Sequence, residues 1–165
     1  MASSKNVLSP EAMRTEVKPD IGVEDEGRKA LVELLNICLC DENLLYVKTR
    51  NYHWNIVGPR FSQLHKFLEE QYEIVNEMAD EVAERARQLG GKALGTMEEY
   101  TRHTSLKEEP GKYPDAQTML SNLLKDHEAI IQSLRDAADQ AEEKYDDMVT
   151  NNFLLNAAEK HEKLA

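Results

Sequence analysis

The sequence predicts an all-α protein in which four long helices pack as one bundle. Glycine and proline are scarce, with 7 and 5 among 165 residues, while apolar residues make up 41% of the chain. Four long segments carry apolar residues at steps of three and four, which is the spacing of one buried helix face. The connection between the second and third segments is long enough to cross the length of a bundle. We therefore expect one four-helix domain over residues 24–165, preceded by a tail over residues 1–23.

The tail has no long apolar pattern. Ser9-Pro10-Glu11 can start one helical turn, and Pro19 would stop it. Its basic and acidic side chains balance, so a basic arm for DNA is not encoded there. The N-terminus also lacks an apolar run of the length that a signal peptide needs.

The first helix is expected from about Glu24 to Ile56. Its buried stripe consists of Leu31, Leu34, Leu35, Cys38, Leu45 and Tyr52. Cys38 and Cys40 are two residues apart, so they point to different faces of the helix and cannot readily form a disulfide. Two cysteines without a framework fit a reducing compartment. Residues 57–60 break the helix and make the next one its antiparallel neighbour.

The second helix is expected from about Ser62 to Leu89, where Gly90 and Gly91 supply the left-handed conformation that ends a helix. Its stripe consists of Leu64, Phe67, Leu68, Tyr72, Val75, Met78, Ala79, Val82, Ala86 and Leu89. The connection over residues 90–114 has room for a short helix near residues 97–100. Because this connection can cross the bundle, the second and third helices can run parallel.

The last two helices are expected at about Asp115–Lys144 and from Val149 to the end. Asp146 and Asp147 mark the turn between them. The third stripe consists of Leu120, Leu123, Leu124, His127, Ile130, Ile131, Leu134 and Ala138. His127 lies on this apolar face, which favours a hydrogen-bonded core histidine over a ligand. The fourth stripe consists of Phe153, Leu154, Ala157, Ala158, His161 and Leu164.

Two pairs of possible metal ligands lie beside the apolar stripe of the second helix. His65 and Glu69 are four residues apart, as are Asp80 and Glu84, so the members of each pair share a face. Since His65 and Asp80 are separated by about 22 Å along the axis, one helix cannot bring both pairs to one ion. A second copy packed antiparallel about a two-fold axis near residues 74–75 would superpose the pairs. Such a dimer would have two identical sites, roughly 20 Å apart.

His53 strengthens this hypothesis. It lies six residues before Pro59, and His65 lies six residues after it, so the two histidines can meet across the helical hairpin. The ordinary alternative is a solvated polar face with charges at i and i+4. Mixed imidazole and carboxylate ligands suit Fe, Mn, Zn or Co better than Ca or Mg, and the ligand types alone leave zinc open.

Several other chemistries find no support in the sequence. There is no glycine-rich phosphate loop after a strand, no Cys-x-x-Cys pair and no Glu-x-x-His motif of an internal di-iron site. The net charge of −11 argues against a nucleic-acid surface and suits one that attracts cations. No segment approaches 18 apolar residues, so we expect no membrane span and a cytoplasmic protein, with nucleoid association as the alternative.

The chain resembles the Dps mini-ferritins, the DNA-binding proteins from starved cells, from about Gly27 to the C-terminus. The matching residues are His53-Trp54-Asn55, Gly58, Leu64-His65, Asp80, Ala83-Glu84-Arg85 and Leu89-Gly90-Gly91. The resemblance implies a ferritin-like four-helix bundle that assembles as a hollow homo-dodecamer. It also implies ferroxidase centres between two-fold-related subunits. His53, His65 and Glu69 of one chain, with Asp80 and Glu84 of its partner, would bind iron there.

By the same resemblance the protein is an enzyme that oxidises Fe(II) with hydrogen peroxide or dioxygen and stores Fe(III). Trp54 would lie beside the centre as a trap for stray oxidising equivalents. Asp146 and Asp147 are the candidates for an iron-entry pore. Glu69 stands where many members have Asp, and Asn152 where Asp is common. Because the tail lacks a lysine cluster, DNA binding should be weak or absent. The alternatives are a DNA-compacting protein and a plain oligomeric bundle, with zinc or without metal.

Overall fold

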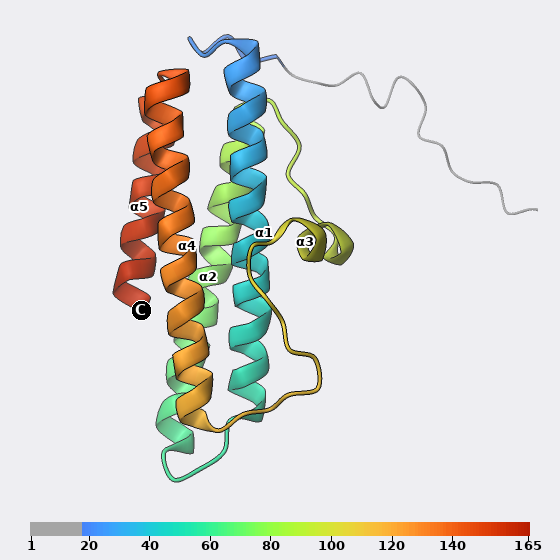
Figure 1. The fold of residues 1–165 in the computed structure, drawn as a ribbon, viewed down its shortest axis with the longest axis vertical. Coiled ribbons are helices and arrows are strands. Elements are labelled where there is room, and N and C mark those ends of the chain that lie inside the picture. The colour runs from blue at the N-terminus through green and yellow to red at the C-terminus, as the bar shows by residue number, and fades with distance from the viewer. Residues whose placement is uncertain (1–17) are drawn as a thin grey trace, which may run out of the picture.

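The computed structural model describes residues 18–165, in which five helices form a four-helix bundle with one short helix outside it (Figure 1). The helices are α1 (Asp25–Asn55), α2 (Phe61–Gln88), α3 (Met97–His103), α4 (Ala116–Tyr145) and α5 (Met148–Leu164). The predicted fold class is confirmed, and each long helix begins and ends within two residues of its expected bounds. The turn expected at residues 9–11 lies outside the described residues, and the division at residue 24 stays a prediction.

α1 and α2 form an antiparallel hairpin whose turn depends on one glycine. Gly58 has a φ of 127°, a conformation that residues with a side chain rarely adopt. Its carbonyl accepts a hydrogen bond from the amide of Phe61, the first residue of α2, at 3.1 Å. The tight turn sets the end of α1 beside the beginning of α2.

The crossover leads from the end of α2 back along the bundle to the beginning of α4, so α2 and α4 run parallel (Figure 1). Midway it forms α3, whose N-terminus has a capping box between Thr96 and Glu99. Asp41 of α1 anchors the next residues by accepting hydrogen bonds from the Thr104 hydroxyl and from the amide and hydroxyl of Ser105. The predicted parallel arrangement is confirmed.

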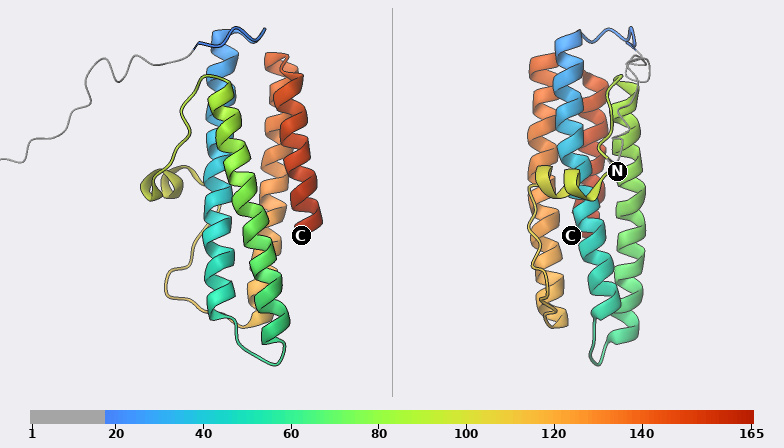
Figure 2. Two further views of the ribbon diagram at one scale, coloured as in Figure 1. Left: turned by 180° about the vertical axis from the view of Figure 1, so that it is seen from behind. Right: turned by 90° about the vertical axis from the view of Figure 1, so that its right-hand side faces the viewer.

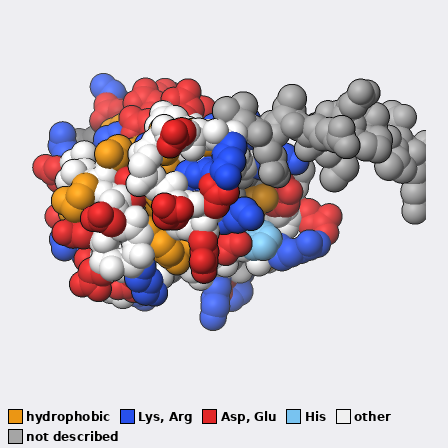
Figure 3. Space-filling view, turned by 90° about the horizontal axis from the view of Figure 1, so that it is seen from above, with side chains coloured by type: hydrophobic (Ala, Val, Ile, Leu, Met, Phe, Trp, Pro, Cys, Tyr) orange, Lys and Arg blue, Asp and Glu red, His pale blue; other side chains and the backbone are white. Residues whose placement is uncertain are grey.

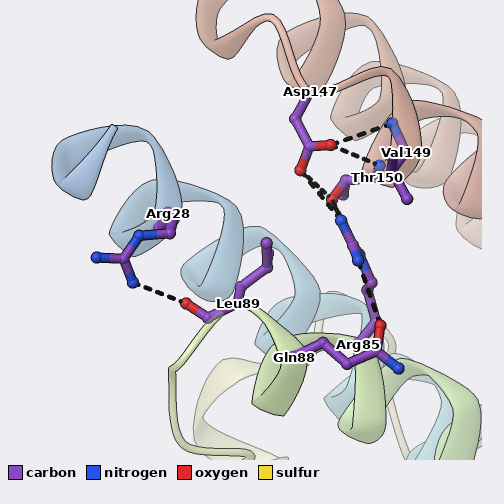
Figure 4. A network of polar contacts seen from close by, with 7 residues as sticks. All are labelled: Arg28, Arg85, Gln88, Leu89, Asp147, Val149 and Thr150. Atoms are coloured by element: carbon purple, nitrogen blue, oxygen red, sulfur yellow. Dashed lines mark hydrogen bonds and ion pairs between the residues drawn. The ribbon is translucent and has the colours of Figure 1, made fainter. Parts of the chain in front are cut away.

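Gly90 and Gly91 end α2 as predicted. Gly90 has a φ of 85°, and the amide of Gly91 donates to the carbonyl of Ala86 at 3.1 Å, which closes the helix end. A Cβ atom on Gly91 would lie 2.3 Å from the side chain of Val32, so α1 approaches here too closely for any other residue. Arg28 of α1 donates to the carbonyl of Leu89 at the same end (Figure 4).

The turn between α4 and α5 is also as predicted. Asp146 ends α4 in the left-handed conformation, with a φ of 50°. The carboxylate of Asp147 caps α5 by accepting from the amides of Val149 and Thr150, and it pairs with Arg85 of α2 at 3.2 Å (Figure 4). This network joins α2 to the α4–α5 turn.

The core lies between α1, α2, α4 and α5, and most residues of the four predicted stripes are buried in it. Phe67 and Leu124, which we expected in the stripes, are 42% and 40% exposed. The reason is the length of α5, which has 17 residues and covers only part of the bundle, as Figure 2 shows from two further sides. Beyond its last residues a groove opens between α2 and α4, lined by Leu64, Phe67, Leu120 and Leu124.

Seen from the end where α1 begins, acidic side chains are spread widely over the surface, with basic ones between them (Figure 3). Among residues 18–165, no helix is both long enough and apolar enough to cross a membrane.

Candidate metal centre

The hairpin brings His53, in the last turn of α1, against His65, in the second turn of α2. Their rings are stacked, with centroids 3.7 Å apart and planes inclined by 22°. His53 is buried and His65 is half-buried. The expected meeting of the two histidines across the hairpin is therefore confirmed, while their role as ligands stays a prediction.

Hydrogen bonds to the backbone fix the tautomer of both rings. Nδ1 of His53 lies 2.8 Å from the carbonyl oxygen of His65, and Nδ1 of His65 lies 2.8 Å from the carbonyl oxygen of His53. A carbonyl oxygen can only accept, so each Nδ1 must carry the proton and donate it. In a neutral ring Nε2 then holds a lone pair, which is the form that binds a metal. In the described residues no hydrogen bond engages Nε2 of His53 or of His65, and neither atom is fully enclosed. Both are therefore open to a ligand.

Aromatic side chains continue the histidine stack on both sides. Phe61 stacks on His65 at 5.0 Å, and the ring of Tyr72 meets His53 edge-on at 5.3 Å. These contacts limit the rotation of the imidazoles and hold their Nε2 atoms in place.

Trp54 lies next to this group but points outward, and it is 63% exposed. The guanidinium of Arg50 lies 4.9 Å from its ring and 6.0 Å from the ring of Tyr72. Both the position of Trp54 beside an iron centre and its protective role stay predictions.

Glu69 follows His65 by one turn of α2 and is half-buried, whereas Asp80 and Glu84 are exposed further along the helix. Other acidic residues of α2 have partners: Glu70 pairs with Lys66, and Glu81 pairs with Lys160. No ion pair among residues 18–165 includes Glu69, Asp80 or Glu84. These three carboxylates are thus available to a cation or to another chain.

The five predicted ligands form two separate groups in one chain. Within the described residues, no set of three or more His, Cys, Asp or Glu side chains could hold a metal ion. His53, His65 and Glu69 lie near the hairpin, and α2 separates them from Asp80 and Glu84 by about 20 Å. Ile74 lies midway along α2 between the groups and is 39% exposed. At about 100° per residue its side chain lies on the side of α2 opposite to His65.

The two residues proposed for an iron-entry pore differ in their surroundings. Asp146 is exposed. Asp147 is 3% exposed, and both of its oxygens accept hydrogen bonds. Oδ2 accepts from Arg85 and from the hydroxyl of Thr150, and Oδ1 accepts from the first amides of α5. The pore role stays a prediction, and Asp146 has the freer carboxylate of the two.

Sequence reasoning did not identify Phe61, Tyr72 or Arg50 as neighbours of the histidine pair. A signal for Phe61 was present, because it precedes His65 by four residues and therefore shares its face. Tyr72 was assigned only to the apolar stripe. Arg50 shares a face of α1 with Tyr46 and Trp54, four residues away on either side. Its contact with Tyr72 depends on how α1 and α2 are rotated against each other, which one sequence does not reveal.

Comparison with protein families and individual proteins supplies a context for this geometry. A profile of the ferritin-like domain matches residues 32–165. An uncharacterized low temperature-induced protein of Nostoc is 44% identical over 146 residues, which cover 88% of this chain and 82% of that protein. DNA protection during starvation protein 2 of Bacillus anthracis is 35% identical and covers 83% of this chain and 92% of its own length.

Solved structures agree with these matches. DpsC from Streptomyces coelicolor superposes with a TM-score of 0.87 at 32% identity, over 92% of this chain and 88% of that one. The Dps protein from Vibrio cholerae has a TM-score of 0.83 at 26% identity, over 89% and 91% of the two chains. The latter is described as a member of a broad superfamily of ferritin-like diiron-carboxylate proteins.

Proposed function

Because the chain belongs to the Dps family of ferritin-like proteins, we propose that it oxidises Fe(II) at centres between two subunits and stores the Fe(III) product. The observation that carries the proposal is the pair His53 and His65, whose backbone hydrogen bonds leave both Nε2 lone pairs without a partner in the chain. Glu69 lies one turn after His65 on α2. Asp80 and Glu84 on the same helix complete the ligand set when a partner supplies them.

Each residue has a distinct task in this proposal. The two imidazoles bind ferrous ion as neutral ligands, and their carbonyl partners keep the rings oriented. Glu69, together with Asp80 and Glu84 of the second chain, supplies negative charge that favours the product with three positive charges over the substrate with two. In the reaction two Fe(II) each lose one electron, and one hydrogen peroxide takes up both electrons and two protons to give two water molecules.

Storage requires a closed shell, and we propose the homo-dodecamer that the family resemblance implies. Exposed apolar side chains beside the histidine pair support a partner there: Trp54, Val57 and Phe61 are each at least 44% exposed. By removing ferrous ion and peroxide together, the protein would protect the cell against oxidative damage.

Mixing two inactive variants tests whether the centre is shared. His65→Ala removes a ligand from one half-site and Asp80→Ala from the other, so assemblies of either variant alone should oxidise almost no Fe(II). In a two-fold pair that contains one chain of each kind, one site has both defects and the other has none. Co-assembly of equal amounts should therefore restore about a quarter of the wild-type activity, because half of the pairs are mixed and each has one intact site.

The measurement is anaerobic addition of Fe(II) followed by peroxide, with ferrous ion determined over time and the assembly sized in parallel. His103→Ala, at an exposed position on α3, is the matched control and should leave oxidation unchanged. No recovery in mixed assemblies of normal size would exclude a centre shared in this way. If Zn(II) binds but Fe(II) is not oxidised by the wild type, a zinc-holding bundle replaces the ferroxidase.

The second candidate is a protein that compacts DNA, which is favoured by the name of the Bacillus anthracis relative. The charge speaks against it, since each chain carries −11 and an assembly multiplies that value. Tight, salt-sensitive retardation of DNA without divalent ions would give this function precedence.

A further inference from the structure

Three titratable side chains from three helices form a hydrogen-bonded chain inside the bundle. Nε2 of His161 on α5 lies 2.7 Å from Oε1 of Glu42 on α1, and Nδ1 of His161 lies 2.8 Å from Nδ1 of His127 on α4. Glu42 and His161 are 0% exposed, and His127 is 1% exposed. None of the three makes a hydrogen bond or an ion pair with a predicted iron ligand, so the proposed ferroxidase leaves this cluster unexplained.

The cluster is the main polar attachment of the second half of α5. His161 connects α5 to both α1 and α4, which enclose it. One turn further, the carbonyl of Leu164 accepts from Gln71 of α2 at 2.8 Å, and on the surface Lys160 pairs with Glu81 of α2. On the surface Glu162 also pairs with Arg135 of α4. Loss of the His161 contacts would therefore weaken the attachment of the end of α5 in the core.

Both ends of the hydrogen-bonded chain lack a partner. Within the described residues, Oε2 of Glu42 and Nε2 of His127 are enclosed and make no hydrogen bond. A second proton would leave a hydrogen on both Nδ1 atoms, so the hydrogen bond that joins the two imidazoles would be lost. Removal of the last proton would leave the buried carboxylate without a cation. Each of these states is costly, because a buried charge needs a partner.

Few other charges bear on the cluster. On α1 these are Asp41, whose carboxylate is held by Thr104 and Ser105, and the buried thiol of Cys38. On α5 the charged neighbour is Lys160, which pairs with Glu81 of α2. The buried α2 residues Gln71, Val75 and Met78 have no titratable group. His127 is the titratable residue that α4 buries, and burial together with His161 lowers its pKa to about 4.

We infer that Glu42, His161 and His127 act as one buried proton-binding site, and that acid opens the bundle there. Protons are counted from the state with an ionised carboxylate and two neutral imidazoles. The closed site holds one such proton, and acid opens the bundle because the open site binds a second. In the closed state the cluster is neutral, with one proton shared between Glu42 and His161. When α5 detaches, both imidazoles reach water and are protonated below about pH 6.5, while the carboxylate stays ionised above about pH 4.3.

The proton count predicts a different acid response for each variant. Between pH 6 and pH 5 the open wild-type cluster holds two protons and the closed one holds one, so opening increases about tenfold per pH unit. In His127→Gln both states hold one proton, and the dependence should almost vanish. In Glu42→Gln the closed state holds none and the open state two, so opening should increase about a hundredfold per pH unit.

Hydrogen exchange of the assembled protein, read by mass spectrometry between pH 6 and pH 5, measures this opening. The protection factor of α5 peptides is compared with that of peptides from the middle of α2, which corrects for the intrinsic effect of pH on exchange. Glu128→Gln, at an exposed position beside His127, is the matched control and should behave as the wild type. An equally steep acid response in His127→Gln, or a flat response in the wild type, overturns the inference even if Glu42→Gln does not fold.

Discussion

Two pairs of histidines face each other across neighbouring helices, and they differ in what their nitrogens contact. In the pair formed by His53 and His65, each Nδ1 donates to a carbonyl and each Nε2 is open. In the other pair, His127 and His161 contact each other through Nδ1, and Nε2 of His161 contacts Glu42. The first pair presents lone pairs to the outside, whereas the second uses its nitrogens inside the core.

The difference shows that two histidines in contact do not by themselves indicate a ligand site. A backbone carbonyl can only accept a hydrogen bond from a ring nitrogen, so the other nitrogen of a neutral ring keeps its lone pair for a cation. A carboxylate in the core instead forms an ion pair with a protonated imidazole, or shares one proton with a neutral imidazole, so that this nitrogen is no longer free for a metal. What each ring bonds to therefore separates a candidate iron centre from a structural and proton-binding cluster.

The largest effect that sharpens this contrast should come from removing one histidine of each pair. His53→Ala should lower the rate of Fe(II) oxidation by at least about 100-fold, because it removes a predicted direct ligand and the ring that stacks on His65. His127→Gln should leave the rate within about twofold of the wild type, because His127 contacts His161 and none of the predicted ligands. Stopped-flow oxidation assays of both variants give the comparison. Equal losses in the two would mean that the iron centre has been assigned to the wrong pair.

A second prediction concerns stability, for which the buried cluster should matter more than the predicted iron ligands. Glu42→Ala should lower the free energy of unfolding by about 3–5 kcal/mol, because it leaves His161 in the core without its carboxylate. Glu69→Ala should change it by less than about 0.5 kcal/mol, because Glu69 is half-buried and makes no ion pair. Urea unfolding at pH 7 measures both values. A larger loss for Glu69 than for Glu42 would show that the predicted ligand is a structural residue.

Most of the fold could be predicted from the sequence because its signals are local. The apolar stripe of α2 and the glycines at residues 90 and 91 define that helix, and the symmetric spacing of the two histidines about Pro59 predicts their contact. The exposure of Phe67 and Leu124 could not be predicted, because it depends on how far α5 reaches along α2 and α4. Rotation of one helix against another likewise decides which residues surround His53.

The buried cluster was missed although its signal was present. Glu42 lies four residues after Cys38 and three before Leu45, so it belongs to the apolar stripe of α1. A carboxylate at such a position requires a partner in the core, and His127 and His161 occupy apolar stripes on two other helices. Polar residues at apolar positions of different helices can therefore be matched before a structure is known, although one sequence does not tell which of them meet.

The smallest effect should come from the aromatic ring that stacks on the proposed iron-binding pair. Phe61→Ala removes the ring 5.0 Å from His65 but leaves both hydrogen bonds to the backbone in place. An aromatic contact contributes about 0.5–1.5 kcal/mol, so the affinity for Fe(II) should fall about 2- to 10-fold. Tyr113→Ala, which removes an exposed ring from the crossover, is the control, and anaerobic titration with Fe(II) measures both. If Phe61→Ala lowered the affinity for Fe(II) as much as His53→Ala does in the same titration, stacking rather than the backbone hydrogen bonds would orient the two imidazoles.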